Sequence, residues 1–538
     1  MVARPSARRS AVNLELEVFR NLFISIAEEM GIVLRRTSFS ANIKERRDYS
    51  CALYDARGQT VAMGDHMPAH LGAMPASVKA VTSEFDLKNG DIYFLNDPFR
   101  GGTHLPDITS VSGVFVGGNA KPQFHLVTRA HHADVGGMVP GSMPLAQEIY
   151  QEGLRIPPVC LVRNGEYDQA LLSMILANVR TPDERLGDLG AQVAAHSVGE
   201  RRVREAIDRY GLEVVTTQMA ALQDYAESVM RSRLDAIPDC CCEFSDWMDD
   251  DGFGSGPVRI TCRLTIQGSQ AIVDFRESAP QTRGGVNANH AVTTSAVMYC
   301  FRCLVDSETP YNSGTLRPIK ILTKPGTVCD ALLPASTAAG NVETSQRIVD
   351  TLLGALGQAL PGEVPAGSSG TMNNISFGGT DPMNGCPFSY YETIAGGMGA
   401  WSGADGLSGI HTHMTNSLNT PIEAFEQQYP VRIARYSLRP GSGGAGARRG
   451  GDGVVREYEF LADASLAILS DRRKQSPRGA RGGADGMTGR NTLDGEELPS
   501  KGNFEVRRGS RLRIETPGGA GYFSSKKLPT NSASMPDE

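Results

Sequence analysis

Long apolar runs, basic blocks and tryptophan are what this sequence of 538 residues lacks. No run reaches the about 18 apolar residues that a membrane span needs. Lysine and arginine are spread along the chain, the net charge is −7, and tryptophan occurs only twice. These features argue against nucleic acid or an anionic membrane surface as the main partner. The first nine residues also lack the apolar core of a secretory signal, which favours a cytoplasmic protein.

The ten cysteines do not follow a pattern typical of disulfides or of a zinc ribbon. Cys240, Cys241 and Cys242 are consecutive, and the side chains of neighbouring residues diverge too far to pair with each other. Cys300 and Cys303 have CxxC spacing, but they lie in an apolar helical stretch without a second pair. We therefore expect buried, reduced thiols at Cys300 and Cys303, and a reducing compartment.

Apolar residues at helical spacing predict a long helix at the start of the chain. Asn13 can cap a helix over residues 14–34, in which Val18, Leu22 and Ile26 repeat every four residues. Two phenylalanines lie beside them and broaden this apolar stripe. The stripe predicts that one face of the helix packs against a core.

Further along the chain, runs typical of strands alternate with helical runs, which predicts a mixed α/β (α+β) protein with several domains. Strands are expected at 51–54, 92–95, 108–116, 124–128, 258–264, 271–275, 466–469 and 512–515, and helices at 169–233, 292–305 and 343–360. The helical block 169–233 has Leu186, Leu189, Val193, Val203 and Ile207 as its expected inner face. The acidic, cysteine-rich stretch 239–251 marks an expected boundary. The predicted division is a disordered arm 1–12, an N-terminal metal-binding region 13–238, a middle region 239–365, a glycine-rich C-terminal region 366–523 and a disordered tail 524–538.

Histidine placement is the most informative feature, because six of the ten histidines lie between His66 and His132. His104 and Asp107 are three residues apart across a proline, so a turn there points both side chains into one pocket. His131 or His132 follows at the end of an expected strand. Neighbours on a strand face opposite sides, so only one of the two shares that pocket. Such a set of imidazoles and carboxylates suits a divalent ion such as zinc or manganese, with room for a water.

A simpler interpretation stays open for these residues. Histidines and aspartates often cap turns or bind backbone groups, and this spacing is not a stereotyped metal motif. His66 and His70 are four residues apart, but Pro68 between them argues against a helical ligand pair. We expect both to be loop residues.

Other polar residues are candidates for catalysis or substrate binding. Glu148 and Glu152 are candidates for a general acid or base, with surface helix charges as the alternative. Asn341, Glu343 and Arg347 begin a helix after a glycine, and the amino end of a helix favours phosphate oxygens. Capping alone also explains Asn341.

Two later histidines, His411 and His413, alternate on an expected strand and would face the same side. Their candidate roles are to line the substrate, to face a partner, or to complete a buried polar network. No nucleophile elbow is present, so the sequence indicates no Ser-His-Asp arrangement.

The motifs along the chain resemble those of the hydantoinase B/oxoprolinase family, in the same order and over nearly the whole length. They are Glu-Arg-Arg-Asp-Tyr-Ser at 45–50, the stretch 96–107, Gly-Gly-Met-Val-Pro-Gly-Ser-Met-Pro at 136–144, Glu-Gly-Leu-Arg-Ile-Pro-Pro at 152–158, Ala-Gly-Asn-Val-Glu-Thr-Ser-Gln-Arg at 339–347, Gly-Thr-Met-Asn-Asn at 370–374, Tyr-Glu-Thr at 391–393, His-Thr-His-Met-Thr-Asn at 411–416, Gly-Gly-Ala-Gly at 443–446, Arg-Gly-Gly-Asp-Gly at 449–453 and Glu-Thr-Pro-Gly-Gly at 515–519. These matches are specific to the family but weak for the individual substrate. The resemblance implies a hydantoinase B-like fold.

The resemblance implies a division of labour between two subunits. ATP is bound by an A-type subunit, which phosphorylates the ring carbonyl oxygen of a hydantoin, 5-oxoproline or similar lactam, and the B-type subunit completes ring opening at a metal site. The sequence contains no Gly-x-x-x-x-Gly-Lys-Ser/Thr loop, which agrees with ATP being bound by the partner. Carried over residue by residue, the implied metal ligands are Asp48, His104, Asp107 and His131, with His132 as the substitute.

Three functions follow as expectations. The leading one is the B-type subunit of an ATP-dependent cyclic amidohydrolase in a hetero-oligomer, using zinc or manganese. Related assemblies carboxylate ketones such as acetone or acetophenone, so a ligase subunit is the second. The third is a non-catalytic scaffold that stabilises the A-type partner.

Overall fold

The computed structural model describes residues 14–64 and 67–524. The predicted arm 1–12, most of the predicted tail 524–538, the capping Asn13 and His66 lie outside these residues. Helices and four separate sheets build the described chain, which confirms the predicted mixed α/β class. Within the described ranges, no helix is long and apolar enough to cross a membrane.

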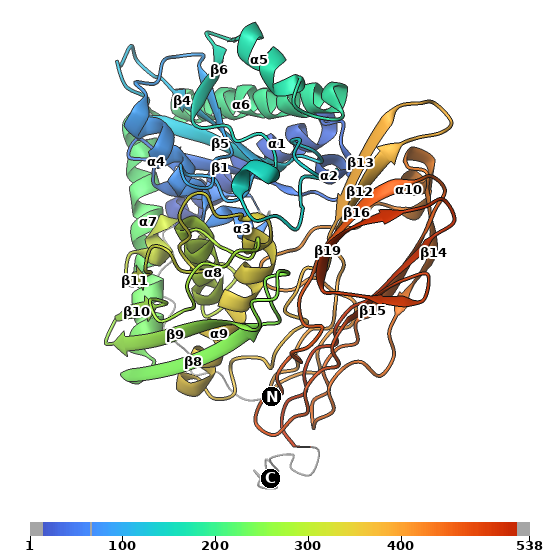
Figure 1. Cartoon of the computed structure of the whole chain (residues 1–538). Coiled ribbons are helices and arrows are strands. Elements are labelled where there is room, and N and C mark those ends of the chain that lie inside the picture. The colour runs from blue at the N-terminus through green and yellow to red at the C-terminus, as the bar shows by residue number, and fades with distance from the viewer. Residues whose placement is uncertain (1–13, 65–66, 525–538) are drawn as a thin grey trace, which may run out of the picture.

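A seven-stranded antiparallel sheet forms the first part of the chain (Figure 1). Its order is β2 (Thr60–Met63), β1 (Tyr49–Asp55), β5 (Phe124–His131), β4 (Asp107–Val114), β3 (Ile92–Leu95), β6 (Val159–Arg163) and β7 (Glu166–Tyr167). Every residue of β1, β3, β4 and β5 is buried or nearly so. Such strands need cover on both faces, and helices α1 (Leu14–Thr37), α4 (Met74–Glu84) and α6 (Pro182–Tyr210) pack against them.

Helix α1 shows why its sequence packs as it does. Its buried face carries Phe19, Phe23 and Ile26 at spacings of four and three residues. The helix and its broad apolar stripe were predicted, and Phe19, Phe23 and Ile26 of that stripe are buried, but Val18 at its edge is 47% exposed. The two phenylalanines bury more apolar area than Val18 and Leu22 and decide which face turns inward. Leu186 of α6 was likewise placed inward and is 41% exposed.

The second sheet has the order β11 (Ile319–Leu322), β10 (Gln270–Asp274), β9 (Val258–Gln267) and β8 (Cys240–Met248). Helices α8 (His290–Arg302) and α9 (Ser345–Ala359) cover one face, and α7 (Leu212–Asp235) connects this part to the first. The cysteine-rich stretch is strand β8, and all ten cysteines are free. Cys300 is buried as expected, whereas Cys303 is exposed at the end of α8.

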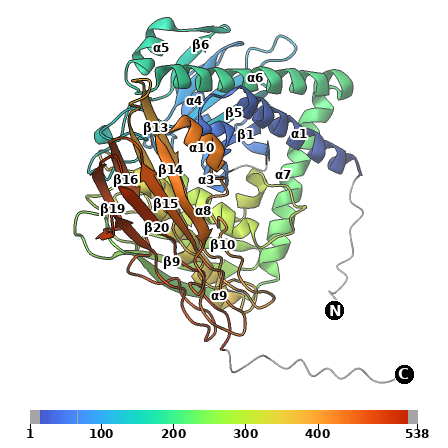
Figure 2. The same ribbon diagram turned by 90° about the vertical axis from the view of Figure 1, so that its right-hand side faces the viewer.

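The third and fourth sheets pack face to face (Figure 1, orange and red; Figure 2). One has the order β13 (Pro387–Glu392), β12 (Asn374–Thr380), β16 (Ala464–Leu469) and β19 (Lys501–Val506). The other has the order β14 (Val431–Leu438), β15 (Val454–Phe460), β20 (Arg511–Glu515), β17 (Arg490–Leu493) and β18 (Glu496–Leu498). Phe377 and Leu466 from the first meet Tyr458 and Leu512 from the second in one buried core.

Two short helical elements complete the frame around the site. Helix α3 (Pro68–Leu71) is a single turn that packs against α8. A π-helical turn, Gly340–Thr344, leads into α9. Turns of this kind often mark functional positions, because one extra residue in the turn re-aims its side chains.

Candidate functional site

A buried carboxylate, Asp107, lies among three imidazoles. Its Oδ1 is 3.0 Å from His104 Nε2 and 3.2 Å from His131 Nδ1, and its Oδ2 is 3.3 Å from His70 Nε2. His70 Nε2 is also 3.7 Å from Oδ1 of Asp48. Ligand atoms of His104, Asp107 and His131 all lie within 4.8 Å of one another, which is the spacing needed for one shared metal ion.

Strand register brings three of these residues together. Asp107 begins β4 and His131 ends β5, and the two are direct partners across the antiparallel pair. Asp48 directly precedes β1, and its carbonyl oxygen accepts a hydrogen bond from the His131 amide at 3.0 Å. The adjacent ends of β1, β5 and β4 therefore carry one site. Close packing in the turn before His104 needs a glycine, because a Cβ on Gly102 would lie 2.3 Å from the Asn96 carbonyl oxygen.

The donor atoms suit a metal ion. Both ring nitrogens of His104, Nε2 of His131 and Oδ1 of Asp107 are buried, and none of them has a partner in hydrogen-bond geometry among the described residues, although His104 Nε2 and Asp107 Oδ1 lie only 3.0 Å apart. Buried polar atoms without partners are rare and call for an ion or a water. The free space beside Asp107 and His131 is about 20 Å³, enough for one ion or one water. Two further donors, His70 and Asp48, line the same space.

Electrostatics favour the metal-binding forms of Asp107 and His131. Burial opposes ionisation of Asp107, but the adjacent His104 and His70 outweigh it and hold the pKa of its carboxyl well below the usual range. Burial lowers the pKa of His131, which therefore stays neutral. A carboxylate beside a neutral imidazole is the protonation state that a divalent ion requires.

A chain of contacts runs from His131 through Tyr391 and Asn374 to Glu343. The ring of Tyr391 stacks on the imidazole, with centroids 4.4 Å apart and planes 14° apart. The Tyr391 hydroxyl donates to Asn374 Oδ1 at 2.7 Å, and Asn374 Nδ2 donates to Glu343 Oε1 at 2.7 Å. Burial, with Asp471 nearby, raises the pKa of Glu343 to about 7. Glu343 therefore supports the histidine indirectly and does not line the space beside it.

Neighbouring polar side chains fix Asp107 and His70. The Thr103 hydroxyl donates to Asp107 Oδ2 at 3.0 Å, and Asn341 Nδ2 approaches the same oxygen at 3.4 Å. Ser50 Oγ lies 3.2 Å from His70 Nδ1. Asn341 was a candidate for substrate binding, and the π-helical turn places it at the rim of the cluster, with Oδ1 buried and lacking a partner in the described chain.

The adjacent histidines separate as strand geometry requires. His131 faces Asp107, whereas His132 points to the other side, where its Nε2 lies 3.1 Å from Gln192 Oε1. Burial lowers the pKa of His132 to about 4. Its assignment as a substitute ligand is therefore corrected, because a strand cannot turn two successive side chains to one face.

The two glutamates proposed as general acid or base lie in different environments. Glu148 is exposed and its side chain caps the 3₁₀ turn Ile149–Gln151, so it has no place at the buried cluster. Glu152 is fully buried, and its Oε1 accepts hydrogen bonds from the Ser336 hydroxyl and from the amides of the next two residues. Burial raises its pKa, and His104 is near enough to oppose that shift. Its Oε2 is buried without a partner among the described residues.

Arg347 is a structural residue instead of a substrate ligand. It is buried in α9, where its guanidinium pairs with Asp246 at 2.9 Å, Asp350 at 3.1 Å and Asp471 at 3.1 Å. These carboxylates occupy the donors that a phosphate would need. The network joins α9 to the second sheet and to the C-terminal part of the chain.

His411 and His413 lie in a loop, so the predicted strand there is wrong. His413 adopts a φ of 60° in a turn, and its Nδ1 is 3.2 Å from the Tyr299 hydroxyl. Burial lowers the pKa of both histidines to about 4. Neither lines the space beside Asp107, whereas Met414 and Thr415, which follow His413 in the loop, do.

Sequence reasoning missed His70 and Tyr391. Pro68 predicts a loop at His70, but the proline occupies the first turn of α3, where its missing N–H costs nothing. A proline two residues before a histidine can thus begin a helix as well as break one. Tyr391 belongs to the quoted motif at 391–393, but its contact with His131 spans 260 residues of sequence, so the motif did not indicate a role at the site.

Known proteins are similar to this chain in sequence. The family model described as hydantoinase B/oxoprolinase matches residues 13–525. The 5-oxoprolinase 1 of Arabidopsis thaliana is 39% identical over 95% of this chain and 42% of its own length. A putative B-type subunit of a D-/L-hydantoinase from Pseudomonas sp. (strain NS671) is 34% identical over 93% of this chain and 88% of its own length. The chain thus spans about two fifths of the plant protein but most of the bacterial one.

A solved structure matches as well. The ATP-dependent caprolactamase of Pseudomonas jessenii superposes with a TM-score of 0.88 at 31% identity, covering 96% of this chain and 91% of that one. The agreement extends over all four sheets and supports a common architecture.

Proposed function

Because the chain belongs to the hydantoinase B/oxoprolinase family, we propose that it is the ring-opening subunit of an ATP-dependent hydrolase of cyclic amides. The buried group of Asp48, His104, Asp107 and His131 carries this proposal. His104, Asp107 and His131 have buried donor atoms without hydrogen-bond partners in the described chain, and Asp48, Asp107 and His131 line a space the size of an ion. Relatives named for 5-oxoproline, hydantoin and caprolactam ring opening support the substrate class.

The residues fit a divalent ion with mixed nitrogen and oxygen ligands, zinc or manganese. We propose Asp48, His104, Asp107 and His131 as ligands. His70 is a further donor, held by Ser50. When bound, such an ion makes water a stronger nucleophile at neutral pH and polarises a carbonyl or phosphoryl oxygen.

The chain's own residues have defined tasks in this proposal. Asp107 orients His104 and His131 through its Oδ1, and Tyr391 holds the His131 ring by stacking. Glu152, with one carboxylate oxygen fixed and the other without a partner in the described chain, is our candidate for moving a proton beside His104. Asn341 is a candidate for contacting the substrate at the rim.

We further propose an ATP-binding A-type partner in a hetero-oligomer. The chain matches most of a protein named as one subunit of a hydantoinase, but only about two fifths of the 5-oxoprolinases. A separate protein would supply what the longer relatives carry in the rest of their length. The ATP-activated amide would then reach this chain for ring opening.

Activity of the assembled complex tests the proposal. The complex of this chain with its A-type partner should consume ATP with hydantoin, 5-oxoproline or caprolactam. It should not consume ATP with acetone or acetophenone plus bicarbonate. His104→Ala should abolish ring opening and leave the complex assembled. Ketone-dependent ATP use would favour a role in a carboxylase instead, and full activity of His104→Ala would leave only a scaffold role.

A further inference from the structure

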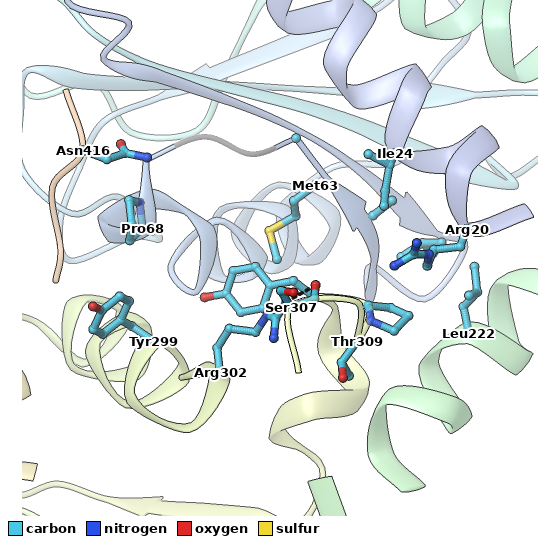
Figure 3. Close-up of a pocket in the computed structure, with 15 residues that line it drawn as sticks. Arg20, Ile24, Met63, Pro68, Leu222, Tyr299, Arg302, Ser307, Thr309 and Asn416 are labelled. Atoms are coloured by element: carbon cyan, nitrogen blue, oxygen red, sulfur yellow. Dashed lines mark hydrogen bonds between the residues drawn. The ribbon is translucent and has the colours of Figure 1, made fainter. Parts of the chain in front are cut away.

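A second cavity of about 420 Å³ lies between helices α1, α7 and α8, strand β2 and the loop 306–311 (Figure 3). Most of its wall is apolar, with contributions from Ile24, Met63 and Leu222. Its size and lining are typical of sites for small organic ligands. The site built around Asp107 does not account for it, since the two cavities share no lining residue.

The charged side chains in the described lining of this pocket all have one sign. Its described lining includes two arginines, Arg20 and Arg302, together with hydroxyl groups, and no aspartate or glutamate. Arg20 is paired with Glu17 and Glu308, which lie outside the lining. Arg302 instead donates to the backbone carbonyls of Asp306 and Ser307, each at 2.7 Å, and has no ion-pair partner among the described residues.

The hydrogen bonds of Arg302 orient its charge. They use one N–H on each terminal nitrogen, so three of the five guanidinium donors remain for another partner. Figure 3 shows the side chain reaching into the middle of the pocket, between Tyr299 and Thr309. A guanidinium held in this way, beside an apolar wall and without an ion-pair partner among the described residues, favours an organic anion.

The pocket adjoins the cluster around Asp107. Pro68 lines the pocket, and the next two residues of α3, Ala69 and His70, line the space beside Asp107. The loop that follows His413 also lies between the two cavities, because Asn416 lines the pocket and the preceding Thr415 lines the space beside Asp107. In Figure 3, Pro68, Asn416 and Tyr299 gather at one end of the pocket. That end is the one nearest the cluster.

We propose that this pocket binds a small organic carboxylate with an apolar, uncharged body, and that Arg302 recognises the carboxylate. The lack of acidic groups in the described lining disfavours a ligand that also carries an ammonium group. The assignment of the ligand as the cyclic substrate rests on the proposed function. The binding itself does not.

A matched pair of probes tests the charge requirement without any mutation. Cyclohexanecarboxylate and cyclohexanecarboxamide share one apolar body and differ only in charge. Isothermal titration of the metal-free chain should show the carboxylate binding at least about tenfold more tightly, as expected for a charge-assisted bond. Equal affinities, or no binding of either probe, would overturn the proposal.

Variants locate the site. Arg302→Gln should weaken carboxylate binding about tenfold or more, whereas Arg302→Lys should retain part of it. Arg276→Gln is the matched control, because Arg276 is exposed and pairs with Asp274 outside the pocket. Loss of binding in Arg276→Gln but not in Arg302→Gln would refute the assignment. Thermal melting confirms that each variant is folded.

These experiments separate carboxylate binding from metal binding and from catalytic turnover. Carboxylate binding should be the same in metal-free and metal-loaded chain; a strict need for metal would place the ligand at Asp107 instead. Titration with 5-oxoproline and with glutamate, its opened form, shows whether the pocket prefers the cyclic substrate or the opened product. We expect 5-oxoproline to bind more tightly. Tighter binding of glutamate would overturn the exclusion of an ammonium group. None of these titrations needs ATP or a partner, so an inactive complex leaves them interpretable.

Discussion

Adjacent histidines offer a matched perturbation of the proposed metal site. His131→Ala removes a side chain whose Nδ1 is 3.2 Å from Asp107, whereas His132→Ala removes one that contacts Gln192 on the opposite face of β5. Both histidines are buried and consecutive, so the two variants lose the same atoms from neighbouring positions. Only His131 is proposed to bind the ion. We therefore expect His131→Ala alone to lose it.

The size of the effect follows from the number of ligands. Structural zinc sites bind with about 10–16 kcal/mol, and four ligands share this free energy. One ligand then contributes about 2.5–4 kcal/mol, so His131→Ala should weaken metal binding by about 100- to 1000-fold. His132→Ala loses one buried hydrogen bond and costs about 1–3 kcal/mol of folding stability. Its metal affinity should stay within about threefold of the parent chain.

Competition with a chromophoric chelator measures both affinities in the same titration. Unfolding curves of the two variants show whether either has lost its fold. Retention of metal by His131→Ala would refute the ligand assignment. Equal loss in both variants would show that the effect is general destabilisation of β5 and not loss of a ligand.

Three further predictions concern the surroundings of the site. Tyr391→Phe keeps the stack on His131 and should lower metal affinity less than tenfold, whereas Tyr391→Ala should lower it about 10- to 100-fold by the same competition assay. The raised pKa of Glu343, about 7 against an ordinary 4.5, gives stability that is complete below about pH 4.5 and lost as the pH rises through about 7. Glu343→Gln should remove this pH dependence, which amounts to roughly 3 kcal/mol. If the free energy of unfolding of the parent chain does not change between pH 4.5 and 8, the prediction is wrong. Glu392 forms a buried ion pair with Arg456 at 2.7 Å, so Glu392→Ala leaves the guanidinium buried without its carboxylate. The free energy of unfolding, measured by chemical denaturation, should fall by roughly 3–5 kcal/mol. A fall below about 1 kcal/mol would show that water replaces the carboxylate.

Local pattern predicted the elements, but packing decided their orientation. The strand at 92–95 and the helices near 292–305 and 343–360 are present, because their apolar periods are strong. In α1, Val18 was included in the predicted apolar stripe but is exposed, while the two phenylalanines beside it are buried. Sequence alone cannot rank two adjacent apolar rows, since only the partner surface selects between them.

The same limit applies to the site. Spacing placed His104 and Asp107 together, and strand alternation predicted that one of His131 and His132 would face them. Choosing between the histidines requires the register of β4 on β5, which depends on the whole sheet. Arg347 was misjudged for a related reason, because its three carboxylate partners include one 124 residues away.

Anomalous diffraction from a metal-loaded crystal tests the central claim most directly. Data collected on either side of the absorption edge of zinc or manganese locate the ion without assumptions about its ligands. We predict one peak bounded by Asp48, His104, Asp107 and His131. A peak at another place in the chain, or none after loading at saturating metal, would contradict the proposed site.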